Sequence, residues 1–251
     1  MEHENNFEKA ENAIEVTSLK IAFNGTEVLK NVSFILNKSE NLIILGKSGS
    51  GKSVLIKCIV QLLFPDQGTI TVLGKNIHTI SKIEQMELRK QIGFLFQSGA
   101  LYDSMTVKEN LEFPLQRHRK RITQEELDHK VNEALTNVGL SNILQKMPSE
   151  LSGGMRKRVA LARTIIVNPL ILLYDEPTTG LDPITSGEIS DLVNQVQEKY
   201  KASSIIITHD IACAKKIGDR LMVLKDGEIK AEGTLQEIEG SDDPCIQSFF
   251  K

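Results

Sequence analysis

The chain has 251 residues, of which 40% are hydrophobic and 25% charged, and its formal net charge is −3. This length is enough for one large α/β domain, or two small ones, with a substantial core. The charge excludes a general attraction to nucleic acid, which requires a strong basic excess, so we expect no nucleic-acid partner. The apolar runs are far too short to span a bilayer, so any membrane role requires a partner.

The N-terminal residues and the cysteines bear on where the protein works. Residues 1–13 are polar and acidic and lack the apolar segment of a signal peptide, so we expect a flexible extension. Cys58, Cys213 and Cys245 lie far apart and have no metal-ligand spacing. Their odd number and low density predict free thiols in a reducing cytoplasm.

The first part of the chain has the pattern of short strands. Turn residues such as Asn24-Gly25 separate four β-rich runs, at 14–22, 32–36, 41–45 and 69–73. One helix interrupts these strands after Lys52, because apolar residues recur at helical spacing from Val54 onward until Pro65 ends the segment. A further predicted strand covers 92–97.

The middle of the chain is mostly helical in pattern, from about 105 to 167. Two capping boxes predict helix starts there, because Thr106 and Thr123 are each followed by a glutamate three residues later. Three short apolar strands come next, at 171–174, 204–208 and 221–225. Helical stretches near 184–201 and 211–217 separate them, and an Asp226-Gly227 turn begins a hairpin that ends near residue 231. The order of elements predicts an α/β nucleotide-binding core with a helical insertion at about 98–165.

One segment fits the phosphate-binding P-loop pattern G-x-x-x-x-G-K-[ST], and it consists of Gly46, Lys47, Ser48, Gly49, Ser50, Gly51, Lys52 and Ser53. Its glycines lack the Cβ atoms that would keep backbone N–H groups from wrapping a β-phosphate. Lys52 adds a charge near the β- and γ-phosphates, and the Ser53 hydroxyl is placed for Mg²⁺. The alternative is a chance match, but the strand before the loop and the helix after it are the context that the motif requires.

A second segment, about a hundred residues later, has the character of another anion site. It consists of Leu151, Ser152, Gly153, Gly154 and Met155. A Ser-Gly-Gly turn that opens a helix can bind an anion, but one chain does not need two such sites for one triphosphate. The two segments together therefore predict an ATP held between two subunits.

Polar residues follow three predicted strands, at the sheet edge where open α/β proteins bind their ligands. Asp175 is a candidate Mg²⁺ ligand, and Glu176 is a candidate catalytic residue that polarises the attacking water. His209, also a candidate catalytic residue, can bond the γ-phosphate and hold that water, and Gln97 can reach the metal. Each residue taken alone also fits an ordinary surface turn, and the P-loop beside them favours the functional interpretation.

In this order the motifs resemble those of the ATP-binding subunit of an ABC transporter, over residues 14–233. The family's Walker A motif matches residues 46–53, its Walker B motif matches 171–176 and its signature motif matches 151–155. Its Q-loop glutamine corresponds to Gln97, its D-loop to Gly180-Leu181-Asp182 and its switch histidine to His209. Phe23 falls where the family places an aromatic ring that stacks on adenine, and a core position is the alternative for it.

The resemblance implies a P-loop NTPase core of the ABC ATPase type with an antiparallel β subdomain, and ATP and Mg²⁺ as cofactors. The core would comprise 14–97 and 166–233, the helical signature subdomain 98–165 and a C-terminal tail 234–251. Ser53, Gln97 and Asp175 would hold the metal. Two copies would dimerise head to tail, so that the signature residues of one copy bind the ATP held by the other.

Local sequence narrows the resemblance further. Met155 stands where glutamine is commoner, and it occurs together with Asp182-Pro183-Ile184-Thr185, residues 97–104, Asp243-Pro244 and Phe249-Phe250. These local sequences are similar to those of the Mla-type ATPases, which work with Mce proteins to move phospholipid between bacterial membranes. The resemblance implies a permease partner, a possible Mce-domain lipid-binding partner and a place on the cytoplasmic face of the membrane.

Two alternatives to phospholipid transport stay open from the sequence. One is an ABC transporter for another cargo, such as polar amino acids or lipoproteins. The other is a soluble ABC ATPase without a permease, of the iron–sulfur assembly or DNA-repair type, although the large insertions of the DNA-repair proteins are missing. The basic run 117–121 could dock to anionic lipid headgroups or an acidic permease loop, but a solvated connection is the favoured interpretation.

Overall fold

The computed structural model describes residues 12–117 and 122–250. Its strands are β1 (Asn12–Phe23), β2 (Thr26–Asn37), β3 (Asn41–Leu45), β4 (Gln67–Val72), β5 (Lys75–Asn76), β6 (Ile92–Leu95), β7 (Ile171–Asp175), β8 (Ser203–Thr208), β9 (Arg220–Lys225) and β10 (Glu228–Gly233). Its helices are α1 (Lys52–Ile59), α2 (Lys82–Lys90), α3 (Val107–Arg117), α4 (Gln124–Asn137), the short 3₁₀ helix η1 (Pro148–Glu150), α5 (Gly153–Ile165), α6 (Pro183–Tyr200), α7 (Ile211–Ile217), α8 (Leu235–Glu239) and α9 (Pro244–Gln247).

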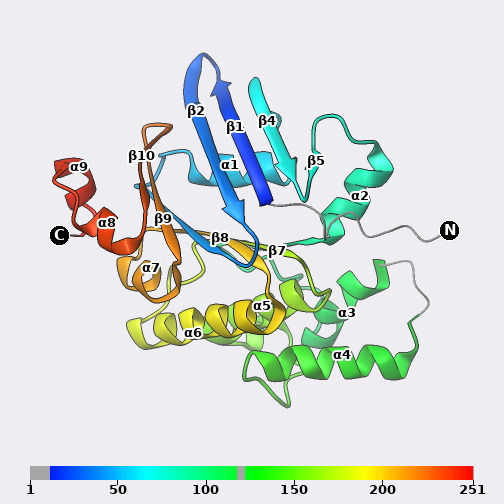
Figure 1. The fold of residues 1–251 in the computed structure, drawn as a ribbon. Coiled ribbons are helices and arrows are strands. Elements are labelled where there is room, and N and C mark those ends of the chain that lie inside the picture. Colours follow the sequence, from blue (N-terminus) through cyan, green and yellow to red (C-terminus); the bar gives the residue numbers. More distant parts are fainter. Residues whose placement is uncertain (1–11, 118–121, 251) are drawn as a thin grey trace.

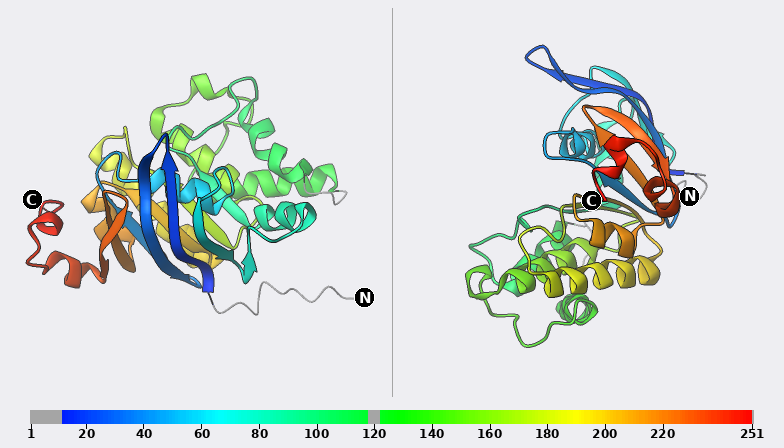
Figure 2. Two further views of the ribbon diagram at one scale, coloured as in Figure 1. Left: turned by 90° about the horizontal axis from the view of Figure 1, so that it is seen from above. Right: turned by 90° about the vertical axis from the view of Figure 1, so that its left-hand side faces the viewer.

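The described strands form two sheets of different kinds. An antiparallel sheet has the order β2-β1-β4-β5, and a second sheet has the order β10-β9-β3-β8-β7-β6. In the second sheet β9, β3, β8, β7 and β6 are all parallel, and β10 joins the edge by an antiparallel hairpin. In Figure 1 and in the right-hand view of Figure 2, the antiparallel sheet and helices α3 to α6 lie on opposite sides of the parallel sheet.

Alternate side chains of the parallel strands belong to two separate hydrophobic cores, one on each face of the sheet. In β3, Ile43 and Leu45 belong to one core with residues of α5, α6 and α7, while Leu42 and Ile44 belong to the other with α1 and the antiparallel sheet. This follows from the period of two in a strand, which sends successive side chains to opposite faces. Because both faces are covered, the strands are continuously apolar, as is typical of buried parallel sheets.

Most of the predicted elements are present with small shifts. The strand predicted at 41–45 and the helix predicted at 211–217 have the expected bounds, and the capping boxes at Thr106 and Thr123 both form. The predicted turn at Asn24-Gly25 and the predicted hairpin turn at Asp226-Gly227 also form. Asn24 and Gly25 have φ of 50° and 80°, and Asp226 and Gly227 have 51° and 80°. Positive φ at both central residues matches the twist that two-residue hairpins require.

The expectation of a flexible N-terminal extension over residues 1–13 is wrong for its last two residues. Strand β1 begins at Asn12, and Ala13 is buried, with its carbonyl accepting a hydrogen bond from the Leu73 amide. These two residues are held by pairing with distant strands, which no local pattern reveals. The rest of the predicted extension and most of the basic run 117–121 lie outside the described residues.

Two further regions differ from the sequence-based expectation. Helix α2 was not predicted, although a Ser81–Glu84 capping box begins it. The residues after 233, left open by the sequence, form α8 and α9, and Ile238 and Ile246 are buried in the core that contains α5 to α7. The tail is therefore part of the fold.

The three cysteines are free thiols, as predicted. Cys58 and Cys213 are buried, and burial raises the pKa of each thiol to about 11. Deprotonation of both is therefore suppressed at neutral pH.

Tyr174, in β7, is buried completely, and its hydroxyl has no hydrogen-bond partner among the described residues. Removing an unsatisfied buried hydroxyl relieves its desolvation cost. We therefore expect Tyr174→Phe to keep or raise the free energy of unfolding in urea, by about 1 kcal/mol. The control is Tyr200→Phe, because the Tyr200 hydroxyl accepts a 2.8 Å hydrogen bond from Asn137 and its loss should destabilise. A marked loss of stability in Tyr174→Phe would contradict the expectation.

Candidate functional site

The parallel sheet brings three loops to one edge. Leu45 pairs with Thr208 at the ends of β3 and β8, and Asp175 pairs with Ile207 between β7 and β8. The loop after each strand therefore starts at nearly the same level. The P-loop follows β3, Glu176 follows β7 and His209 follows β8.

A cleft of about 620 Å³ opens at this edge. It is lined by Val28, Lys47, Ser48, Gly49, Gly51, Lys52, Ser53, Val54, Gln97, Asp175, Glu176 and His209. Most of the residues predicted to hold ATP and its metal thus converge in one place. Gly46 and Ser50, also predicted, are buried and do not line the cleft.

The backbone of the P-loop depends on its glycines. Gly49 and Gly51 have φ of 81° and 104°, which residues with a side chain rarely adopt. A Cβ on Gly46 would lie 2.5 Å from the Leu224 carbonyl oxygen and from Ser50 Oγ, so no side chain fits there. The glycines therefore let the backbone turn tightly at the start of α1, which is the conformation that suits a phosphate cradle.

Lys52 is a buried lysine within this cradle. Its Nζ donates to the carbonyl oxygens of Gly46 at 2.5 Å and Lys47 at 3.0 Å. Burial lowers the pKa of its ammonium group, while the carboxylates of Glu176 and Asp175 raise it. The charge lies where it can meet the phosphates of a nucleotide.

Ser53 and Asp175, two of the predicted metal ligands, lie next to each other in the cleft. Ser53 Oγ donates to Asp175 Oδ1 at 3.4 Å, and burial raises the pKa of the Asp175 carboxyl. The described residues contain no group of three or more His, Cys, Asp or Glu side chains that could hold a metal. A hydroxyl and one carboxylate, with Gln97 at the same cleft, still suit Mg²⁺, which commonly uses few protein ligands together with substrate phosphates.

Glu176 and His209 are bonded to each other. His209 Nδ1 lies 2.8 Å from Glu176 Oε2, and the Thr179 hydroxyl donates to the same oxygen at 2.9 Å. The Glu176 side chain is 12% exposed, so it is not the solvated turn residue that was its alternative. Its φ is 52°, a left-handed conformation that is costly for a residue with a side chain and that is concentrated at functional sites.

The signature and D-loop residues cap helices outside this cleft. Ser152 is the N-cap of α5, and its Oγ accepts a bond from the Met155 amide at 3.2 Å. A Cβ on Gly154 would lie 2.7 Å from Thr185 Cγ2, so the start of α5 is tight against the start of α6. Asp182 is the N-cap of α6, and a hydrogen bond from the Thr185 hydroxyl is the main cause that lowers its pKa. None of the five signature residues lines the cleft.

Phe23 does not take the core position that was its alternative. It is 41% exposed at the end of β1, and it is not among the residues that line the cleft. Its stacking on adenine stays a prediction.

Two basic residues of α5 were missed by the sequence analysis. Lys157 is 8% exposed, and its Nζ donates to the Gln97 carbonyl oxygen. Arg163 donates to the carbonyl oxygens of Gly99, at 3.1 Å, and Ala100, at 2.9 Å. A signal was available for Lys157, because Ala160, Leu161 and Thr164 follow it at helical spacing and mark the buried face of α5.

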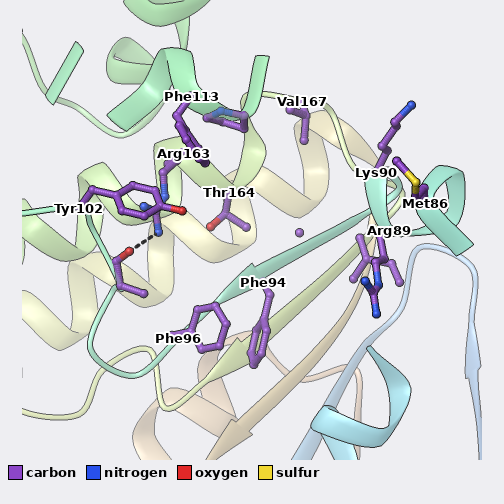
Figure 3. Close-up of a pocket in the computed structure, with 14 residues that line it drawn as sticks. Met86, Arg89, Lys90, Phe94, Phe96, Tyr102, Phe113, Arg163, Thr164 and Val167 are labelled. Carbon is purple, nitrogen blue, oxygen red and sulfur yellow. Dashed lines mark hydrogen bonds between the residues drawn. The ribbon is translucent and has the colours of Figure 1, made fainter. Parts of the chain in front are cut away.

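A second cleft, of about 660 Å³, lies beside the Gln97 loop (Figure 3). In Figure 3 Phe94 and Phe96 face Tyr102, Phe113 and Arg163 across the opening. The ring centroids of Phe94 and Phe96 are 4.0 Å apart, and those of Tyr102 and Phe113 4.8 Å. The cleft thus has aromatic walls and, from Arg89, Lys90 and Arg163, a cationic rim.

Among residues 12–117 and 122–250, none of the helices combines the length and the hydropathy of a membrane-spanning segment.

Comparison with known proteins agrees with this geometry. Residues 29–179 match the family model described as "ABC transporter". The chain is 37% identical over 238 residues to the "Probable ribonucleotide transport ATP-binding protein mkl" of Mycobacterium tuberculosis, with 95% of this chain and 66% of that protein covered. It is 36% identical over 241 residues to the "Intermembrane phospholipid transport system ATP-binding protein MlaF" of Haemophilus influenzae, with 96% of this chain and 91% of that protein covered.

A solved structure gives the same fold. The ATP-binding cassette MJ0796, in a dimeric post-hydrolysis state bound to ADP and Pi, superposes with a TM-score of 0.80 at 32% identity. The match covers 88% of this chain and 98% of that one. The predicted fold class is thereby confirmed. The chain belongs to the ABC transporter family, as one of its ATP-binding cassettes.

Proposed function

We propose that this protein is the ATP-hydrolysing subunit of a phospholipid transporter and that it works as a head-to-tail pair of copies around two ATP molecules. The observation that carries the proposal is the 620 Å³ cleft, which gathers the P-loop, Gln97, Asp175, Glu176 and His209 at one sheet edge. This set combines a phosphate cradle, metal-type oxygen donors and a carboxylate paired with an imidazole. Together these are the parts that phosphoryl transfer to water requires.

Each residue has a role that follows from its place. The P-loop amides and Lys52 bind the phosphates, and Ser53, Asp175 and Gln97 would hold Mg²⁺. The metal, when bound, supplies positive charge that neutralises the phosphate oxygens. Glu176 takes the proton of the attacking water, and His209, bonded to Glu176 Oε2, orients that carboxylate.

The position of the signature supports a pair of copies. Ser152 caps the start of α5 away from the chain's own cleft, and Ser152 is exposed there. The free backbone amides at a helix start favour an anion. A second copy, turned head to tail, supplies that anion as the γ-phosphate of its own ATP. A similar cassette, MJ0796, is dimeric in the structure described above.

The cargo is assigned from the relatives and from local sequence. MlaF is named for intermembrane phospholipid transport, and mkl for ribonucleotide transport. Met155 and the Asp182-Pro183-Ile184-Thr185 segment resemble the corresponding sequences of the Mla-type phospholipid transport ATPases. We therefore place this chain with a permease and an Mce-domain lipid-binding protein, at the cytoplasmic face of a membrane.

The aromatic cleft of Figure 3 is the place proposed for the permease. Arg163 forms part of this cleft and also holds the Gln97 loop by its bonds to Gly99 and Ala100. A permease segment seated there is thereby connected to the metal site through one side chain. The aromatic walls suit an apolar helix face, and the cationic rim suits an acidic residue on the same helix.

The test of the transporter assignment is co-purification from detergent-solubilised membranes of the native host. We expect the tagged protein to bring down a multi-spanning protein and an Mce-domain protein. Recovery of soluble partners alone would overturn both the permease and the cargo proposals.

The assignment of Glu176 is tested by Glu176→Gln. We expect this variant to bind ATP, to hydrolyse it at least about 100-fold more slowly and to accumulate as a dimer, because the glutamine cannot take the proton. The readouts are phosphate release and light scattering after size exclusion. Glu198→Gln is the control, since Glu198 is exposed on α6 away from the cleft, and it should keep wild-type turnover. Unchanged turnover in Glu176→Gln would remove this residue from the base role.

The docking cleft is tested by Met86→Glu. Met86 is 53% exposed and lines the aromatic cleft, so a carboxylate there should disturb an apolar partner helix. We expect recovery of the permease to fall about tenfold or more while the ATPase activity of the purified subunit is unchanged. Ile83→Glu is the matched control, because Ile83 is 75% exposed on the same helix and does not line the cleft. Equal permease recovery by both variants would place the permease elsewhere.

A further inference from the structure

Two lysines are buried among the described residues, Lys52 and Lys157, at 7% and 8% exposure. A buried ammonium group is costly unless its donors are bonded. Lys52 has its place in the phosphate cradle. Lys157 lies on a different element, α5, outside the residues that line the nucleotide cleft, and its burial calls for a separate explanation.

Lys157 joins two segments of the site through their backbones. Its Nζ donates to the Gln97 carbonyl oxygen at 2.5 Å and to the Glu176 carbonyl oxygen at 3.4 Å. These are the residues proposed to reach the metal and to accept the proton of the water. One ammonium group is therefore hydrogen-bonded both to the loop after β6 and to the loop after β7.

Both segments have strained backbones at or near these contacts. Glu176 has a φ of 52°, and Ala100, three residues after Gln97, has a φ of 47°. Left-handed conformations of residues with side chains persist only where the surroundings hold them. Lys157 and Arg163 supply such support from α5, since Arg163 bonds the Ala100 carbonyl oxygen at 2.9 Å.

The same helix carries the signature at its start. Lys157 follows Ser152 by five residues, which is about 7.5 Å along the helix axis. Helix α5 is also in close contact with the Gln97 loop, because a Cβ on Gly99 would lie 3.2 Å from Ala160 Cβ. A displacement of the start of α5 must therefore act on Lys157 and on the two carbonyl oxygens that it holds.

We infer that Lys157 is a positioning residue that couples the two ATP sites of the pair. When the signature of one copy binds the partner's ATP, α5 fixes the position of Lys157. Lys157 in turn positions Gln97 and Glu176 around the ATP bound by its own copy. The coupling rests on the proposed dimeric function. The tether itself, from Lys157 to the two backbone segments, belongs to the single chain and can be tested without nucleotide.

The first arm of the test is hydrogen exchange of the nucleotide-free protein. The Gly99 amide donates to the Phe96 carbonyl oxygen and the Thr179 amide to that of Glu176, so both report on the tethered turns. We expect Lys157→Met to speed exchange in both turns by about tenfold while exchange in α1 and β4 stays unchanged. Lys157→Arg keeps a cationic donor and should restore slow exchange. Lys130→Met, on α4, is the matched control.

The second arm uses the Glu176→Gln background with a fluorescent ATP analogue. We expect Lys157→Met to leave the affinity of the P-loop for the analogue within about twofold, and to weaken ATP-driven dimer formation about tenfold or more. If Lys157 only filled the core, its substitution by Met would lower the thermal stability and the affinity for the ATP analogue together, without local changes in hydrogen exchange. Lys157→Gln, whose neutral amide nitrogen lies one bond closer to the backbone than the lysine Nζ and so falls short of the two carbonyl oxygens, serves as the disrupting variant if the Met variant does not fold.

The outcomes separate the two proposals. If Glu176→Gln alone fails to dimerise with ATP, the dimeric function fails, and the exchange arm still decides the tether. If Glu176→Gln dimerises and the added Lys157 substitution changes neither dimerisation nor exchange at Gly99 and Thr179, the role of Lys157 is overturned.

Discussion

Parallel pairing of β3, β7 and β8 is the constraint on which the rest of the structure depends. Their register places the ends of all three strands at one edge, and the loop after each strand supplies one part of the site. Such strands are apolar on both faces, so each face must be covered. The antiparallel sheet with α1 covers one face, and helices α5 to α7 cover the other. The layers around the sheet are therefore a condition for the site.

Burial at this edge makes the charges of the site depend on one another. It lowers the pKa of the Lys52 and Lys157 ammonium groups and raises that of the Asp175 carboxyl, and in each case burial is the largest cause. The carboxylates of Asp175 and Glu176 counter the effect on both lysines. The chain thus holds cations and anions close together in a poor solvent, where an added phosphate chain and metal interact more strongly than in water.

The sequence predicted what local patterns encode. Continuous apolar runs revealed the strand at 41–45, and the P-loop and the residues after β7 and β8 stood out because their chemistry is tied to strand ends. Helix α2 escaped because a single residue, Leu88, is buried in it, which leaves little amphipathic pattern. Pairing of Asn12 with Asn37 joins residues at opposite ends of the β1–β2 hairpin, so no local pattern around Asn12 reveals it. Lys157 could be suspected from its place on the buried face of α5, but its two bonds to other segments require the tertiary structure.

The two candidate anion-binding segments differ in what surrounds them, and this difference is the basis for the proposed pair of copies. The P-loop lies within a cleft that also contains metal-type donors and a proton acceptor. The start of α5 has an exposed Ser152, whose hydroxyl accepts a hydrogen bond from the Met155 amide, but none of the signature residues lines that cleft. Helix α5 is held to the Gln97 loop by Lys157 and Arg163, so the signature at its start is fixed relative to that loop. Enclosure by the signature of a second copy, as proposed, leaves α5 attached to this loop, and for this reason the proposed function takes a pair of chains as the unit that completes the site.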